Sequence, residues 1–305
     1  MSLLRRKLST LIGGAALSLT GCATTAVEPK AAPAPAAAEA SGPALWKVAD
    51  EDTTIYLFGT VHALPKDVEW FRGPIADALT ASQTLVTEIP QGELLKPESQ
   101  KAFLARAQLP AGESLRDKLT AEQRATYEAA LTKFGLPVGA FDKVEPWFAA
   151  MTLSALPLLK GGYSMEAGVE SSIEAKAGTK TRDALETVDG QLALFDEMPM
   201  AVQIAYLMSV AEKMDDVTPS MNGMVAAWAR GDADRLAELM NAQIDDPAIA
   251  ERLLYQRNRD WAKWVETRLD QPGTVFVAVG AGHLAGANSV QDYLTKSGTA
   301  VVRVQ

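Results

Sequence analysis

The two histidines of this 305-residue chain are its clearest indication of chemistry, because each is the last residue of a G-x-x-H tetrad. Gly59 begins the tetrad that ends at His62, and Gly280 begins the tetrad that ends at His283, with Gly282 directly before the second histidine. Imidazole is the commonest metal ligand in proteins and can transfer protons near neutral pH. The repeated placement predicts one shared metal or catalytic site. The plainer alternative is a pair of histidines that only pack turns.

A hydrolytic metal site needs more than two imidazoles, because it also requires a further ligand, often a carboxylate, and an open position for water. Glu88 is the leading supplier, since it is the only charged residue in the apolar segment 85–89. A carboxylate buried there would be costly unless it were paired or metal-bound. Glu88 is therefore expected to act as a ligand or as the general base, and the alternative is an edge-strand charge in water.

Arg257 is placed in the middle of an apolar stripe on a predicted helix. A guanidinium stays charged when buried, so this position predicts an anionic partner or an oxyanion for Arg257. The alternative is an arginine whose stem packs while its head reaches water. Asn258, at the edge of the stripe, is placed to orient a substrate or a ligand. The apolar members of the stripe are Ile249, Leu253, Leu254, Trp261 and Trp264.

The elements that must position these residues are strands at both ends of the body and helices between them. Strands are predicted at 54–58, 84–89, 274–279 and 299–304. Helices are predicted at 120–134, with a Thr120–Gln123 capping box, at 146–159, 200–213 and 233–241, and from Pro247 to just before Pro272. This order predicts an α/β fold in which a central mixed sheet, built from two related halves, carries a large helical insertion. Each half would present one histidine at the carboxyl end of a strand, where ligand sites of α/β sheets gather.

Residues 1–21 have the pattern of a secretion signal. Three cations at 5–7 precede an uncharged apolar stretch, 8–19, that is too short to span a bilayer. The stretch runs into Leu-Thr-Gly-Cys, which resembles the lipobox of bacterial lipoproteins. Cys22, the only cysteine, is therefore the predicted lipidation site, and the alternative is a buried cysteine near an ordinary cleavage site. Ala23 after the cysteine favours a lipid-anchored protein of the outer membrane facing the periplasm.

Composition restricts the partners of the mature chain. Residues 22–43 are rich in Ala and Pro and predict an extended tether, followed by one folded domain at 44–305. The formal net charge is −9, and cleavage before Cys22 would remove three cations and move it to −12. Such acidity argues against nucleic acid or anionic lipid as partners and suits cation binding. The oligomeric state is not indicated.

Several enzyme classes lack their required motifs in this sequence. It contains no G-x-S-x-G elbow, H-E-x-x-H helix, P-loop or dinucleotide fingerprint. The usual serine hydrolases, zincins and nucleotide enzymes are thereby excluded. A thiol protease is excluded as well, because the mature chain would have no free thiol.

The full set of motifs resembles the TraB/GumN family, which includes the Tiki metalloproteases, and the resemblance extends from Trp46 to Gln305. It is carried by the paired tetrads, Glu88 after a strand, Leu185-Glu186-Thr187 followed by Gln191, Arg257-Asn258, and the closing Val279-Gly280-Ala281-Gly282-His283-Leu284. Members of the Tiki branch are metal-dependent peptidases that use manganese or cobalt and clip short amino-terminal segments.

The resemblance implies that His62, His283 and Glu88 surround the metal, with Arg257 assisting. It adds Glu186 and Asn258 as catalytic candidates. At Glu170 the family pattern favours aspartate, so the resemblance leaves the role of that residue open.

These observations predict a lipid-anchored, metal-dependent hydrolase that acts on a peptide or protein, with Mn, Co or Zn as its divalent metal. Arg257 would stabilise the developing oxyanion. The first rival is a non-catalytic envelope lipoprotein that binds haem or a metal through the two histidines. The second is a regulatory scaffold.

Overall fold

The computed structural model describes residues 42–94, 96–242 and 247–305. The predicted signal peptide, Cys22 and most of the predicted tether lie outside the described residues. Gly42 and Pro43, the last residues of that tether, are buried in the folded body, where the Gln305 amide donates a hydrogen bond to the Pro43 carbonyl at 3.0 Å. No helix in the described ranges is both long and apolar enough to cross a bilayer.

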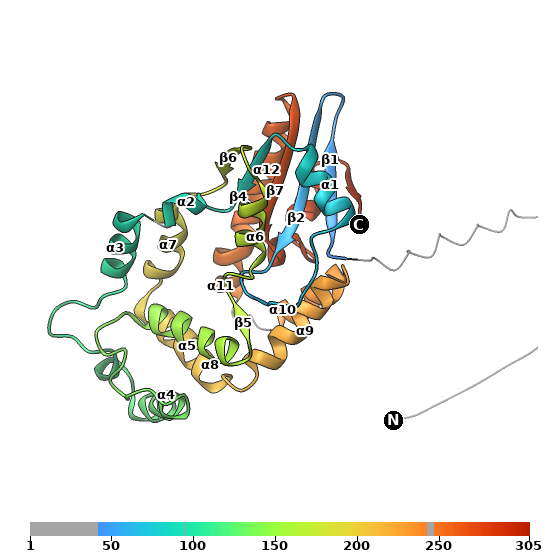
Figure 1. The fold of residues 1–305 in the computed structure, drawn as a ribbon. Coiled ribbons are helices and arrows are strands. Elements are labelled where there is room, and N and C mark those ends of the chain that lie inside the picture. The colour runs from blue at the N-terminus through green and yellow to red at the C-terminus, as the bar shows by residue number, and fades with distance from the viewer. Residues whose placement is uncertain (1–41, 95, 243–246) are drawn as a thin grey trace, which may run out of the picture. The chain divides into compact units, whose positions relative to one another are not determined.

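A six-stranded mixed sheet forms the centre of the fold, in the order β6-β4-β7-β2-β1-β8 (Figure 1). Its strands are β1 (Leu45–Ala49), β2 (Thr53–Thr60), β4 (Thr84–Thr87), β6 (Thr181–Ala184), β7 (Gly273–Gly280) and β8 (Val301–Arg303), while β3 (Leu64–Pro65) and β5 (Tyr163–Ser164) pair separately. β6, β4, β7 and β2 run parallel, and β1 is antiparallel to β2 and β8. The predicted α/β fold and the four predicted strands are confirmed.

Two strands of the sheet were not predicted. β6 lies at the edge of the sheet, and its residues Thr181-Arg182-Asp183 are exposed, so they show no apolar pattern that would indicate a strand. β1 precedes β2 and pairs with it antiparallel along its whole length. The middle of the chain is therefore not purely helical, because β6 returns to the sheet between two groups of helices.

The alternating side chains of the strands build two separate cores. Phe58, Leu85 and Phe276 face a layer that contains α1, α6, α9 and α10. Leu57 and Val277 face the opposite layer, which contains α12 and α13. The layer helices are α1 (Gly73–Ala81), α6 (Val169–Lys176), α9 (Val217–Ala229), α10 (Ala233–Asn241), α12 (Gln256–Leu269) and α13 (Val290–Lys296).

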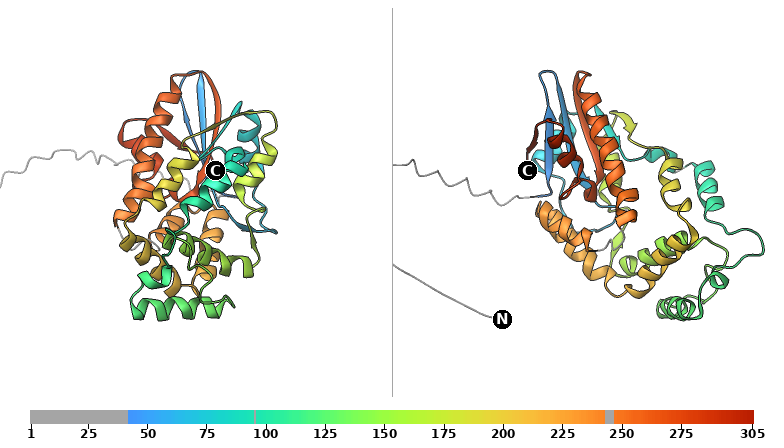
Figure 2. Two further views of the ribbon diagram at one scale, coloured as in Figure 1. Left: turned by 90° about the vertical axis from the view of Figure 1, so that its left-hand side faces the viewer. Right: turned by 180° about the vertical axis from the view of Figure 1, so that it is seen from behind.

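A third core, made by helices alone, lies at one end of the sheet, and both views of Figure 2 show these green and gold helices together there. This core contains α4 (Ala121–Lys133), α5 (Pro146–Lys160) and α8 (Met200–Glu212). The other α-helices are α2 (Gln91–Leu94), α3 (Pro97–Arg106), α7 (Val188–Asp196) and α11 (Pro247–Ala250). Short 3-10 turns lie at Leu115–Lys118 and Ala281–Leu284. The predicted capping box is present, since Thr120 Oγ1 accepts from the Gln123 N–H and Gln123 Oε1 accepts from the Thr120 N–H.

The long helix predicted from Pro247 is interrupted. α11 passes into a π-helical segment, Glu251–Tyr255, before α12 begins. Periodicity alone does not reveal such a widened turn, which is frequently found at functional sites. Here it directly precedes Arg257.

Candidate active site

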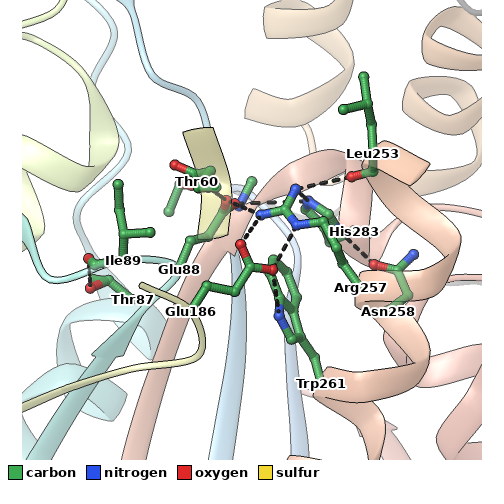
Figure 3. A network of polar contacts seen from close by, with 12 residues as sticks. Thr60, Thr87, Glu88, Ile89, Glu186, Leu253, Arg257, Asn258, Trp261 and His283 are labelled. Atoms are coloured by element: carbon green, nitrogen blue, oxygen red, sulfur yellow. Dashed lines mark hydrogen bonds and ion pairs between the residues drawn. The ribbon is translucent and has the colours of Figure 1, made fainter. Parts of the chain in front are cut away.

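The candidate residues converge because three parallel strands end at one edge of the sheet. β2 and β7 are neighbours in register, with Gly59 opposite Val279 and Thr60 opposite Gly280, so the two G-x-x-H tetrads lie side by side. β4 borders β7 on its other side and ends with Thr87 opposite Ala278, so Glu88 follows at the same edge. Arg257 reaches this edge from α12 (Figure 3).

The glycines of the tetrads are required by this close approach. A Cβ on Gly59 would lie 3.0 Å from the Cα of Ala281 in the neighbouring turn. A Cβ on Gly280 would lie 3.0 Å from Glu88 Oε1, the atom that accepts the Gly280 N–H at 2.6 Å. A Cβ on Gly282 would meet the end of the flexible Met240 side chain. Glycine therefore permits the turns and the carboxylate to pack directly on one another.

Arg257 is the centre of the polar network, and all five of its N–H groups are engaged. Nε and Nη2 donate to the two oxygens of Glu186 at 2.7 and 3.1 Å, and Nη2 also donates to Glu88 Oε2 at 2.7 Å. Nη1 donates to the Leu253 carbonyl and to Nε2 of His283, both at 3.0 Å. The predicted anionic partners are thus Glu186 and Glu88. All five N–H groups of Arg257 have partners within the protein in this arrangement, and its expected role at an oxyanion stays a prediction.

His283 is buried behind this network, with 5 % of its side chain exposed. Its Nδ1 lies 2.5 Å from Asn258 Oδ1, and the amide of Asn258 in turn donates to the Asn288 carbonyl at 2.7 Å. This chain of bonds identifies Nδ1 as the protonated nitrogen and leaves the Nε2 lone pair toward Arg257. Burial lowers the pKa of His283 to about 3, with the positive charge of Arg257 acting in the same direction, so the ring is neutral at neutral pH.

Glu88 is ionised in this site. Burial by itself would raise its pKa, but His283, Arg257 and the Gly280 N–H lower the pKa to about 2. Because His283 is itself neutral near pH 7, the attraction there comes from Arg257, the Gly280 N–H and the protonated His62. Gln191 of α7 also donates to Glu88 Oε2, at 2.9 Å. Three hydrogen bonds, from Arg257, Gly280 and Gln191, therefore fix this carboxylate at the sheet edge.

His62 differs from His283, although their tetrads look alike in sequence. β2 stays extended to Thr60, whereas the second tetrad turns into a 3-10 helix directly after Gly280. As a result 68 % of the His62 side chain is exposed, and its Nδ1 lies 2.6 Å from Glu170 Oε1. The hydrogen bond to Glu170 raises the pKa of His62 to about 9.

Glu170, whose role the sequence left open, is thus a direct partner of His62, and Thr60 also donates to it at 2.6 Å.

Two further residues, Trp261 and Gln191, were not expected in the network. Trp261, predicted only as part of an apolar stripe, donates to Glu186 at 3.0 Å and packs its ring 4.2 Å from that of His283. Gln191 was part of a motif without an assigned role. Thr187 caps α7 and places Gln191 on its first turn, which is the one sequence signal for its position.

A cavity of about 640 Å³ adjoins this cluster. His62, Glu88, Glu170 and Gln191 line it on one side, whereas His283 and Arg257 lie behind them. The remaining walls come mainly from α3, α5 and α7, so the helices that follow β4 enclose the space in front of the strand ends. The cluster can therefore meet a bound molecule through His62 and the carboxylates.

Comparison with known proteins identifies the family. The sequence profile described as the TraB/PrgY/gumN family matches residues 44–303. The chain belongs to this family. It is also 25 % identical over 246 residues to the protein YbaP of Escherichia coli K12, which is described as uncharacterized. The aligned region covers 78 % of this chain and 87 % of YbaP. The YbaP protein of Shigella flexneri matches with the same identity and coverage. No solved structure shows significant similarity to the chain.

For this TraB/PrgY/gumN member, the resemblance noted in the sequence implied a metal on His62, His283 and Glu88. Within the described ranges, no three His, Cys, Asp or Glu side chains are grouped to hold one ion. Arg257 instead contacts both His283 and Glu88. Imidazole and carboxylate are nevertheless ligand types that divalent cations accept in proteins. Each imidazole is bonded through Nδ1, to Glu170 or to Asn258, as metal-ligating histidines commonly are. Nε2 of His283 is occupied by Nη1 of Arg257 at 3.0 Å in this arrangement.

The net negative charge of the cluster also favours a bound cation. Glu88, Glu170 and Glu186 are largely buried, and in the described part of the chain Arg257 is the guanidinium that pairs with Glu88 and Glu186. The remaining negative charge raises the pKa of His62, so the site takes up a proton. A divalent cation would satisfy the same excess of negative charge and leave His62 neutral, as a ligand must be.

Proposed function

We propose that this chain is a metal-dependent hydrolase, most simply a peptidase, that works at the carboxyl edge of its sheet. The observation that carries the proposal is the convergence of His62, Glu88 and Glu170 on one wall of a cavity. The two Nδ1-bonded imidazoles and Glu88 supply the ligand types expected for Mn, Co or Zn. When bound, the ion would polarise the scissile carbonyl and lower the pKa of a water molecule.

The residues of the chain then divide into two groups. His62 and Glu88 face the cavity, where they meet the metal and the substrate. Glu170 holds the His62 ring through Nδ1, and Asn258 holds His283 in the same way. Arg257, itself fixed by Glu186, holds Glu88 and balances its charge. Glu88 acts as ligand or as base in this scheme.

The proposed setting is the bacterial cell envelope, because the lipobox-like segment that ends at Cys22 supports a lipid anchor. The folded body would then act on peptides in the periplasm, tethered to the outer membrane. Labelling with a radioactive fatty acid in cells tests the anchor, and Cys22→Ser should remove the label.

The decisive experiment measures cleavage of a peptide library by the purified protein after EDTA treatment and after addition of Mn, Co or Zn singly. Cleavage should require one of these ions, and elemental analysis should find about one ion per chain. His62→Ala should abolish both cleavage and metal binding while leaving the circular dichroism spectrum unchanged, because His62 is mostly exposed.

Full cleavage in EDTA or by His62→Ala would dispose of the proposal. A Soret band on adding haem, without metal-dependent cleavage, would favour the haem-binding rival. Absence of both haem binding and metal binding would leave a regulatory scaffold.

A further inference from the structure

The cavity beside the candidate active site has an apolar wall that the chemistry proposed above does not use. It comprises Phe103 and Leu104 of α3, Met151 of α5, Met165, and Leu192 and Phe195 of α7. This wall belongs to the helices between β4 and β7, whereas the polar side of the cavity belongs to the sheet edge. The cavity therefore joins an apolar surface directly to His62 and Glu88.

Three side chains of this wall are exposed to an unusual degree. The described residues include seven exposed large apolar side chains, and Leu104, Met151 and Met165 are three of them, at 53, 36 and 60 % exposure. Their gathering around one cavity matters because single exposed apolar residues are common, whereas a cluster marks a binding surface. A ligand in the cavity would remove this apolar surface from water.

The wall contains aromatic side chains that are held in place and methionine side chains that are flexible. Trp147, which is fully buried, contacts Phe103 with ring centroids 5.8 Å apart and Phe195 with centroids 6.2 Å apart, so the aromatic part is held in place. Met151 and Met165 are unbranched and flexible, and they can fit side chains of different shape. Such a surface can bind apolar groups of several different shapes.

The polar groups around the cavity further restrict the chemical class of ligand that can bind there. Among the residues that the structure describes, no lysine or arginine lines it, and its charged residues are His62, Glu88 and Glu170. An anionic group would be repelled by the carboxylates of Glu88 and Glu170. The amides of Gln91 and Gln100 and the hydroxyls of Ser99 and Ser171 also line the cavity. These groups can bond a peptide backbone, whereas a plain acyl chain would leave them without partners.

We infer that the cavity binds a peptide segment through a bulky apolar side chain, such as Leu, Met or Phe, next to the bond to be cleaved. This inference rests on the proposed function, because it names the substrate class of that site. Phe103, Leu104, Met165 and Phe195 then determine specificity, and the sheet edge supplies the chemistry.

The test measures peptide binding by calorimetry with the EDTA-treated full chain, so that binding is separated from cleavage. The peptides are neutral-ended pentapeptides, acetyl-Ala-Ala-X-Ala-Ala-amide, with X as Leu, Phe, Ser or Asp. The Leu and Phe peptides should bind at least about tenfold tighter than the Asp peptide.

The matched variants are Leu104→Ser with Met165→Ser in the cavity, and Leu159→Ser outside it. Leu159 is 58 % exposed and does not line the cavity, so its substitution makes the same chemical change elsewhere. The double variant should weaken binding of the Leu peptide roughly fivefold to tenfold. Leu159→Ser should change it less than about twofold, and neither change should lower the melting temperature appreciably, because all three side chains are exposed.

Equal binding of the Leu and Asp peptides, or no effect of the cavity variants, would overturn the inference. Binding of a dodecanoyl amide in place of the peptides would also overturn it, by assigning the cavity to acyl chains. If the apolar peptides bind through the cavity but no ion supports their cleavage, the inference stands and the hydrolase proposal fails. If ions support cleavage without any preference for the side chain at X, the hydrolase proposal stands and the inference about the apolar wall fails.

Discussion

At the scale of single residues, the site depends on how each charge is compensated. Arg257 contacts two carboxylates, an imidazole and a backbone carbonyl, and 12 % of its side chain is exposed. A buried ion pair is costly to break, because the partner left behind remains buried without its counter-charge. Arg257 is thus as important for the stability of the sheet edge as for its chemistry.

Replacement of Arg257 by Ala should lower the free energy of unfolding by about 3 kcal/mol or more, since Glu88 and Glu186 would lose their shared partner. Arg257→Lys should recover only part of this loss, because an ammonium group cannot reproduce five N–H contacts in one plane. Urea unfolding measures both. A lysine variant as stable as the parent would show that the guanidinium geometry is unimportant.

The buried neutral state of His283 predicts a pH dependence of stability. Its pKa is about 3 in the folded chain, well below its ordinary value of 6.5, so the unfolded chain binds a proton that the folded chain excludes. Stability from this group is present above about pH 6.5 and is lost as the pH falls toward 3. Between pH 6 and 5 the free energy of unfolding should fall by up to about 1.4 kcal/mol.

His283→Gln should remove most of this slope between pH 6 and 5, when urea unfolding is compared at both values. The acid loss that remains in the variant should begin below about pH 4.5. In that range Glu88, whose pKa is lowered to about 2, starts to lose its advantage over the unfolded chain. An unchanged slope in His283→Gln would mean that the ring is not buried as a neutral group.

At the scale of elements, two short features place the side chains that the strands cannot reach. α6 begins against the turn that carries His62, where the Val169 N–H donates to the Val61 carbonyl at 3.0 Å. The π-helical segment Glu251–Tyr255 allows Arg252 to bond carbonyls at the end of α7 while Arg257 reaches the site. In a regular α-helix, residues five apart point about 140° apart, and the wider π turn brings them closer to one face.

Gly168→Ala should destabilise the chain by about 2 kcal/mol or more and separate Glu170 from His62, because its Cβ would lie 2.1 Å from the His62 carbonyl oxygen. Denaturant unfolding measures the loss, and metal affinity should fall with it. Gly92→Ala is the matched control. Gly92 lies in α2 with no atom within 4 Å of the added Cβ, so that change should be neutral or slightly stabilising. Equal effects of the two substitutions would contradict the proposed role of Gly168.

At the scale of the whole molecule, the sheet and the helices have separate tasks. The parallel strands bring His62, Glu88 and His283 to one edge, and the helices between β4 and β7 enclose the space in front of it. A metal bound at this edge would connect β2, β4 and β7 and should therefore stabilise the fold as a whole.

Addition of the active ion to EDTA-treated protein should raise the melting temperature by roughly 5–10 °C at a concentration about 100 times the Kd, since such binding adds about 2.7 kcal/mol. Differential scanning calorimetry measures the shift. His62→Ala should show little or no shift, because it lacks one of the proposed ligands. A shift of the same size in that variant would place the ion elsewhere.

Local sequence was sufficient to predict the α/β class, the strands that carry the tetrads, the capped helix 121–133 and the burial of Arg257 against carboxylates. These features follow from periodicity, from capping residues and from the cost of burying a charge, all of which act over a few residues. β6 was missed because an exposed edge strand needs no apolar pattern, and the π segment because one widened turn leaves the periodicity almost unchanged.

Only the tertiary structure decided how the two histidines differ. Their tetrads are alike in sequence, yet one histidine is mostly exposed and bonded to Glu170, and the other is buried and bonded to Asn258 and Arg257. The engagement of every Arg257 N–H and the apolar wall facing the strand ends were equally beyond reach of local patterns. Exposure, hydrogen-bond partners and pKa depend on residues from separate elements of the chain, and folding alone brings these residues together.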